Sequence, residues 1–175
     1  MRFGGNTAYV EGWALYAESL GYQMNMYDDP YQRFGNLNDE MLRAMRLVVD
    51  TGIHNLGWTR DQSITYMLTH SGMSKTDATA EVERYIAIPS QALAYKIGAL
   101  TIQRLRDKAQ AELGPKFDYR EFHAEVLDTG ALPLPVLEHK IDAWIAARKS
   151  GPDAVPAPAP TPASAPAAGA SGERG

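Results

Sequence analysis

The stretch NTAYVEGWALYAESLG, residues 6–21, decides the fold class of this chain. Its apolar, aromatic and small residues cover nearly every side of a helix, which is typical of a helix packed in a protein interior. Two carboxylates, Glu11 and Glu18, interrupt this pattern and share one helical stripe. Burying a carboxylate is costly unless it is ion-paired or bound to a metal. Glu11, between Val10 and Gly12, is therefore the first candidate functional residue.

Two interpretations of Glu11 are open from the residues alone. In the first, its carboxylate pairs with an arginine of a neighbouring helix at the edge of the core, which is a structural role. In the second, it belongs to a site. Gly12 costs roughly 1 kcal/mol relative to alanine inside a helix, but it lets another backbone or a ligand approach beside the carboxylate.

The sequence up to residue 150 predicts an all-α, multi-helix array without strands, because apolar residues recur at helical spacing. Thr59 with Gln62 and Asp118 with Glu121 have the spacing of capping boxes. Ser74 and Ser90 are expected N-caps, and Gly114 and Gly130 are expected helix stops. The expected helices span residues 7–27, 31–56, 60–71, 75–88, 90–113, 118–129 and 134–148.

Composition narrows the class of protein. The chain has 175 residues, 45% hydrophobic and 22% charged, which is typical of one globular domain. Its net charge of −4 and the lack of a Lys/Arg run argue against nucleic-acid binding. There are no cysteines, no apolar run long enough to span a membrane, and no signal peptide in the opening MRFGGN.

The composition changes at Gly151. Residues 151–175, GPDAVPAPAPTPASAPAAGASGERG, contain almost no large apolar side chain. Such a segment cannot bury enough surface to offset its ordering entropy. We therefore expect a folded domain over 1–150 and a disordered Pro/Ala-rich tail over 151–175.

A second polar stripe lies in MLRAMRLVVDTGIHNLGW, where Arg46, Asp50 and His54 follow at steps of four. They share one helix face, so the aspartate could orient the imidazole and the arginine could keep the aspartate ionised. The alternative is a solvated face with a helix-supporting ion pair.

A third group surrounds the helix break at Pro89, namely Tyr85, Gln91, Tyr95 and Lys96. A phenol or an amide at such a corner could donate to a developing oxyanion. The alternative is that the tyrosines simply pack a helix–helix corner.

Motifs that would complete a metal site are missing. A helical zinc site usually begins with two histidines four residues apart. None of the four histidines, His54, His70, His123 and His139, has such a partner. The residues alone thus support a helical domain with one buried acid, Glu11, and one polar helix face formed by Arg46, Asp50 and His54.

Four blocks, in order, resemble a known family: AYVEGWALYAESLG, RLVVDTGIHNLGWTRDQSITYM, EVERYIAIPSQALAYKIG and FHAEVLDTGALPLPVLEHKIDAWI. Between Arg2 and Ile145 the chain is similar to the C-terminal part of the bacterial domain-of-unknown-function family 885. Members of that family resemble helical zinc metallopeptidases of the gluzincin kind. They carry an H-E-x-x-H-like segment upstream of the E-G-W-A block.

The resemblance implies that Glu11 is the third zinc ligand and that the substrate of the full-length fold is a peptide. It implies His54 or Tyr95 as the group that stabilises the oxyanion. Arg46 and Asp50 would support the site, and Tyr85, Gln91 and Lys96 would line the cleft.

This chain departs from the family pattern in two ways. It has Pro89-Ser90-Gln91 where Pro-Gly-Gln is expected, and it lacks the H-E-x-x-H-like segment. We therefore expect a fragment whose N-terminal half is missing, inactive alone because catalytic zinc needs three protein ligands. The compartment stays unassigned. The alternative is a non-enzymatic helical module, or a degenerate remnant, with structural polar residues.

Overall fold

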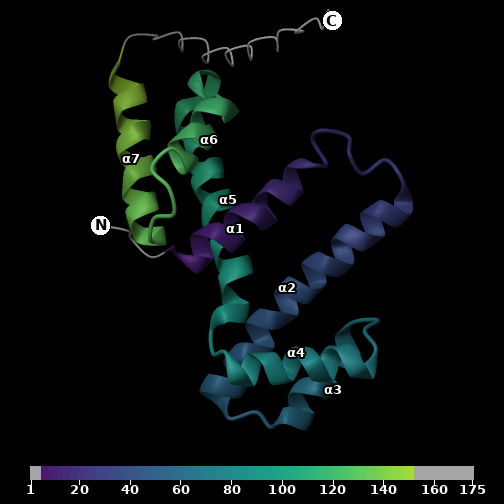
Figure 1. Cartoon of the computed structure of the whole chain (residues 1–175). Helices are drawn as coiled ribbons and strands as arrows, with labels where there is room; N and C mark the ends of the chain where they lie inside the picture. Colours follow the sequence, from purple (N-terminus) through teal and green to yellow (C-terminus); the bar gives the residue numbers. More distant parts are fainter. Residues whose placement is uncertain (1–4, 152–175) are drawn as a thin grey trace, which may run out of the picture.

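The computed structural model describes residues 5–151, which are helical and contain no strand (Figure 1). The predicted all-α class is confirmed. The elements are α1 (Thr7–Leu20), α2 (Pro30–Leu56), α3 (Arg60–His70), α4 (Lys75–Ala87), the short 3₁₀ turn η1 (Gln91–Leu93), α5 (Ala94–Leu113), the 3₁₀ turn η2 (Gly114–Lys116), α6 (Tyr119–Leu127) and α7 (Leu134–Ser150). Among these residues, no helix combines the length and hydropathy needed to cross a lipid bilayer.

The helix ends follow from local sequence signals. Thr59 and Gln62 form the predicted capping box, with each side chain bonded to the other residue's backbone N–H. Ser74 and Asp118 cap α4 and α6 through their side chains. Gly114 ends α5 with a φ of +53°, a conformation that glycine adopts without steric cost.

Two predicted boundaries are wrong. The first helix ends at Leu20 rather than near residue 27, since the Tyr27 ring folds back over Gly21 and its hydroxyl donates to the Glu18 carbonyl. Ser90 is not a side-chain N-cap. It has a left-handed φ of +69° and makes no capping hydrogen bond.

Two separate cores hold the helices together. The first contains buried residues of α1, α5, α6 and α7, among them Tyr16, Ile102 and Phe122. The second contains residues of α2, α3, α4 and η1, among them Met67 and Tyr85. Because η1 leads directly into α5, this one helix connects the two cores, as Figure 1 shows.

The helices α1 and α5 cross at two glycines, Gly12 and Gly98. A Cβ built on Gly12 would lie 2.4 Å from the Gly98 backbone, and one built on Gly98 would lie 1.8 Å from the Ala8 carbonyl oxygen. Gly12 therefore admits a neighbouring helix, one of the two uses that the sequence left open.

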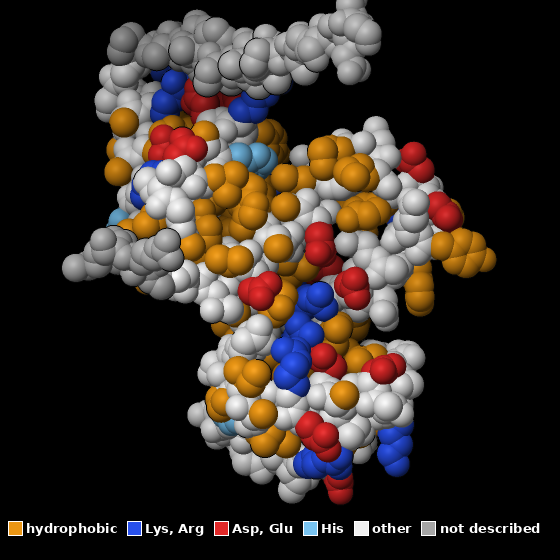
Figure 2. All heavy atoms as spheres, in the orientation of Figure 1, with side chains coloured by type: hydrophobic (Ala, Val, Ile, Leu, Met, Phe, Trp, Pro, Cys, Tyr) orange, Lys and Arg blue, Asp and Glu red, His pale blue; other side chains and the backbone are white. Residues whose placement is uncertain are grey.

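Large apolar side chains remain exposed on α1 and along the first half of α2 (Figure 2). Val10 on α1 is 52% exposed, and Phe34 and Leu37 on α2 are 70% and 60% exposed. The predicted disordered tail lies, apart from Gly151, outside the described residues.

Candidate functional site

Glu11 lies in the middle of α1, next to the Gly12–Gly98 crossing, and its side chain is half-buried. No hydrogen bond or ion pair reaches its carboxylate from any residue between 5 and 151. The structural interpretation required an arginine partner, and none of the described arginines provides one. This half-buried acid therefore lacks the compensation that burial demands.

A groove of about 710 Å³ begins one helical turn before Glu11. Thr7 and Ala8 of α1 form one side, and the segment from Ile88 to Gln91 with α5 forms the other. Glu11 follows Thr7 and Ala8 by four and three residues, so it is their neighbour on the helix surface, although it does not itself line the groove. Much of the lining is apolar, including the exposed Ile88 and Ile97.

The predicted second and third groups come together in one polar network between α2 and α4. Arg46 donates from Nε to the Tyr85 hydroxyl at 3.0 Å and from Nη2 to Glu81 Oε2 at 2.9 Å. The Tyr85 hydroxyl donates in turn to Glu81 at 2.5 Å. Arg84 bridges Glu81 and the Gln91 side-chain oxygen, each at 2.9 Å.

Arg46, Asp50 and His54 on α2 make other contacts than those predicted. Asp50 accepts from the Ser90 backbone N–H, at 3.1 Å for its nearer oxygen, and His54 Nε2 donates to the Tyr85 carbonyl at 3.0 Å. No hydrogen bond joins Arg46 to Asp50 or Asp50 to His54 within the described chain. The three residues thus clamp the α4–η1 corner onto α2 rather than bonding to one another.

The electrostatics of this network follow from burial and hydrogen bonding. Burial raises the pKa of Asp50, and the Ser90 N–H and the nearby His54 only partly offset that effect. Burial alone would raise the pKa of Glu81. The hydrogen bonds from Arg84, Tyr85 and Arg46 outweigh this effect and lower the pKa to about 2. Burial and the bond to Glu81 raise the pKa of Tyr85.

Tyr85 is therefore a protonated phenol, 1% exposed, and its hydroxyl already donates its one hydrogen bond to Glu81. It cannot donate to a bound substrate. Gln91 and Tyr95 keep donors available: the Gln91 oxygen is held by Arg84, which leaves its NH₂ free, and no described residue bonds the Tyr95 hydroxyl. The guanidinium of Arg46 lies 5.0 Å from the centre of the Tyr95 ring.

The candidate residues do not all meet at one cavity. Gln91 lines the groove, whereas Glu11, His54 and Tyr95 are not among its lining residues. Lys96 is ion-paired with Glu40 and lines a different depression, between α1, α2 and α5. Neither groove therefore brings Glu11, His54 and Tyr95 together.

Sequence reasoning missed Glu81 and Arg84, although both anchor the network. With Tyr85 they occupy positions i, i+3 and i+4 of α4, so they share one helix face. That spacing was readable in EVERY, residues 81–85, once Tyr85 had been singled out.

Comparison with known proteins identifies a family and a similar solved structure. The family described as "Bacterial protein of unknown function (DUF885)" matches residues 1–141. The crystal structure described as "the putative lipoprotein from Colwellia psychrerythraea" is 50% identical with a TM-score of 0.78. The match covers 80% of this chain and 24% of that one, so this chain spans about a quarter of that relative's length. No curated protein matches.

Proposed function

This chain belongs to the bacterial DUF885 family, and on that premise we propose that it supplies a metal ligand and one cleft wall of a zinc-dependent, peptidase-like hydrolase. Glu11 is the proposed ligand. The groove between α1 and the Ile88–Gln91 segment is the proposed wall. Peptides are the proposed substrate class.

The observation that carries this proposal is the half-buried Glu11 carboxylate without a partner in residues 5–151. A carboxylate in an apolar wall is stabilised when a divalent cation neutralises it. Glu11 is also one helical turn from Thr7 and Ala8, which line the groove, so a cation on its carboxylate would lie near a ligand bound there.

Zinc fits these residues only in part. Among residues 5–151 no three His, Cys, Asp or Glu side chains are grouped to hold a metal ion. Catalytic zinc needs three protein ligands and an open position. Glu11 therefore serves as one ligand of a site whose other ligands lie outside these residues, and we propose that the chain alone is inactive.

The contribution of the remaining residues is to bind and orient a substrate. The Gln91 NH₂ is positioned by the Arg84–Gln91 bond and lies at the groove, where it can donate to a peptide carbonyl. Tyr95 is the next candidate donor, since Arg46 holds its ring and its hydroxyl is unbonded among the described residues. His54, being bonded to the Tyr85 carbonyl, acts mainly on the position of α4.

A chimera tests the proposal. Residues 1–150 of this chain replace the matching quarter of the Colwellia protein, and zinc content is measured by mass spectrometry together with cleavage of a fluorogenic peptide library. We expect about one zinc per chain, lost in Glu11→Gln and kept in Glu83→Gln, a matched acid that is ion-paired at the surface. A chimera without zinc, or one whose zinc survives Glu11→Gln, overturns the proposal.

A specific observation also favours a second candidate, the non-enzymatic helical module. The buried polar side chains of the α2–α4 network have partners inside the chain: Arg46 bonds Glu81, Asp50 bonds Ser90, and Tyr85 bonds both Arg46 and Glu81. Such a network needs no ligand to be stable. A chimera that folds normally but neither binds zinc nor hydrolyses peptides would favour the non-enzymatic module over the hydrolase.

A further inference from the structure

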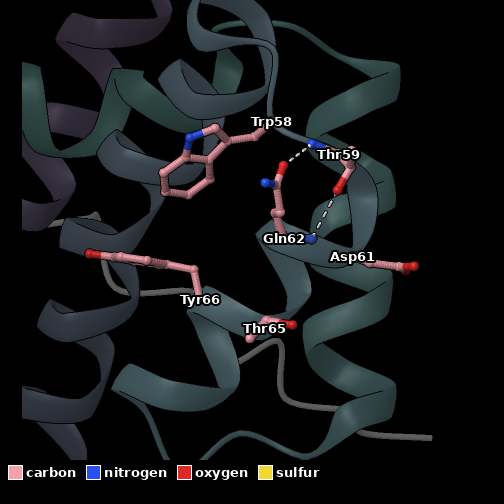
Figure 3. Close-up of a pocket in the computed structure, with 6 residues that line it drawn as sticks. All are labelled: Trp58, Thr59, Asp61, Gln62, Thr65 and Tyr66. Carbon is pink, nitrogen blue, oxygen red and sulfur yellow. Dashed lines mark hydrogen bonds between the residues drawn. The ribbon is translucent and has the colours of Figure 1, made fainter.

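A second depression, of about 550 Å³, lies where α2 joins α3 (Figure 3). Trp58 and Tyr66 project to the same side of it, and their ring centroids are 5.5 Å apart. Thr59, Asp61 and Thr65 complete the lining. This pocket is separate from the groove between α1 and the Ile88–Gln91 segment, and the two share no lining residue.

The walls of the pocket are held firmly. The Trp58 ring packs on Gly52, where an added Cβ would lie 2.5 Å from the indole, and the Trp58 backbone N–H donates to the Gly52 carbonyl at 2.9 Å. Tyr66 stacks on His70 with centroids 4.1 Å apart. Both rings therefore stay in place without a ligand.

One hydrogen-bond donor of the lining lies close to the Trp58 ring (Figure 3). Gln62 accepts the Thr59 backbone N–H with its side-chain oxygen at 2.8 Å, which completes the capping box and leaves its NH₂ group unused (Figure 3). Two aromatic walls and a fixed amide donor are the features with which proteins bind proline-rich, polyproline II segments. Proline rings pack on the aromatic faces, and the ligand's fully solvated carbonyls accept hydrogen bonds.

The chain itself carries such a ligand. Residues 155–162, VPAPAPTP, have proline at every second position and no charge. We propose that the Trp58–Tyr66 pocket binds this segment from a second copy of the chain.

The segment cannot seat along its whole length in the pocket of its own chain, because its first residues stay close to Gly151. Gly151 follows α7, whose Lys149 is ion-paired with Glu112 near the C-terminal end of α5, while the pocket belongs to the core at the other end of α5. The helix α5 has 20 residues and so rises about 30 Å. Three residues separate Gly151 from Val155, so Val155 lies at most about 14 Å from Gly151. A tail from a second molecule has no such limit.

Tail-to-pocket binding is a head-to-tail contact, which leaves a free tail and a free pocket at the ends of every assembly. It therefore predicts open-ended self-association that grows with concentration. Sedimentation velocity of the full chain between about 10 µM and 1 mM should show a rising average mass. Adding a synthetic peptide of residues 154–166 should return the chain to monomer and shift the Trp58 indole N–H signal in NMR.

Two variants test the two halves of the contact. Pro158→Ala with Pro160→Ala changes only the tail, and Thr65→Arg fills the pocket from an exposed position without touching the core. Each should reduce self-association at least five-fold. Thr76→Arg, an equally exposed threonine of α4, should leave it unchanged.

Three results would overturn the proposal. The first is a mass independent of concentration together with no Trp58 shift at millimolar peptide. The second is self-association that persists in the tail variant, which would assign it to the exposed apolar side chains of α1 and α2 instead. The third is a Trp58 shift that depends on the tail prolines but not on concentration, which would mean binding within one chain.

Discussion

The glycine crossing of α1 and α5 gives the sharpest prediction, because it sets where Glu11 lies. In Gly98→Ala, the new methyl would lie 1.8 Å from the Ala8 carbonyl oxygen and 2.7 Å from the Gly12 Cα. Both are backbone atoms, so no side-chain rotation can relieve the overlap. Contacts under 3.0 Å do not persist, so α1 and α5 must separate by about 1 Å. A gap of that size removes roughly a quarter to a half of the dispersion energy of the atoms facing it.

The magnitude follows from two opposed effects. Overpacking of this kind costs about 3 kcal/mol or more, while replacing a helical glycine by alanine returns about 1 kcal/mol of helix propensity. We expect Gly98→Ala to lower the unfolding free energy by about 2 kcal/mol and Tm by roughly 4–8 °C. The matched control is Gly35→Ala in α2, where nothing lies within 4 Å of the added Cβ, and a gain of up to about 1 kcal/mol is expected.

The assay is urea unfolding of the full chain followed by circular dichroism at 222 nm. The double variant Gly12→Ala with Gly98→Ala should cost less than the two single costs added together, because one separation of the helices relieves both contacts. If Gly98→Ala keeps the unfolding free energy of the starting protein while Gly35→Ala raises it, α1 and α5 are not tightly packed at Gly98. The placement of Glu11 beside the groove would then be wrong.

Three further perturbations test the network and the caps. Ser90→Gly should raise stability by about 1 kcal/mol in thermal unfolding, since Ser90 holds a left-handed φ of +69°; a loss would mean that its hydroxyl matters more than its backbone. Hydrogen bonds lower the pKa of Glu81 from 4.5 to about 2, so its carboxylate stabilises the fold fully above pH 4.5, and that stabilisation is lost as pH falls from about 4.5 to 2. Glu81→Gln should flatten that part of the stability–pH curve. An unchanged slope would refute the assignment. Thr59→Ala should cost about 1 kcal/mol by removing half of the capping box, and a neutral result would show that Gln62 alone suffices.

Local signals in the sequence predict most of this fold, and the exceptions have physical causes. The capping box at Thr59 and the stop at Gly114 follow from bonds within a few residues, so sequence spacing is enough to find them. The end of α1 depends on Tyr27 folding back over Gly21, a contact made after the chain reverses. The left-handed conformation of Ser90 could be predicted only from the glycine that the family pattern has at that position, since serine itself does not favour this conformation.

The site residues show the same division. Spacing correctly placed Arg46, Asp50 and His54 on one helix face, but it could not tell what stood opposite that face. The answer was α4 and the backbone of Ser90, so these residues bond across to another helix instead of along their own. Pairing across helices depends on tertiary packing, which a pattern of four-residue steps does not contain.

The contrast between the two polar features is the strongest argument about function. A protein that buries Arg46, Asp50 and Tyr85 gives each of them a partner, as the cost of an unpaired buried group requires. The same chain leaves the half-buried Glu11 carboxylate without a partner among residues 5–151. If Glu11 were a structural acid, the nearby packing of α1 on α5 could have supplied a lysine or arginine as readily as the α2–α4 interface supplied Arg46. It supplies two glycines instead, which bring the helices together, and the proposed metal ligation would give the unpaired carboxylate the partner that it lacks.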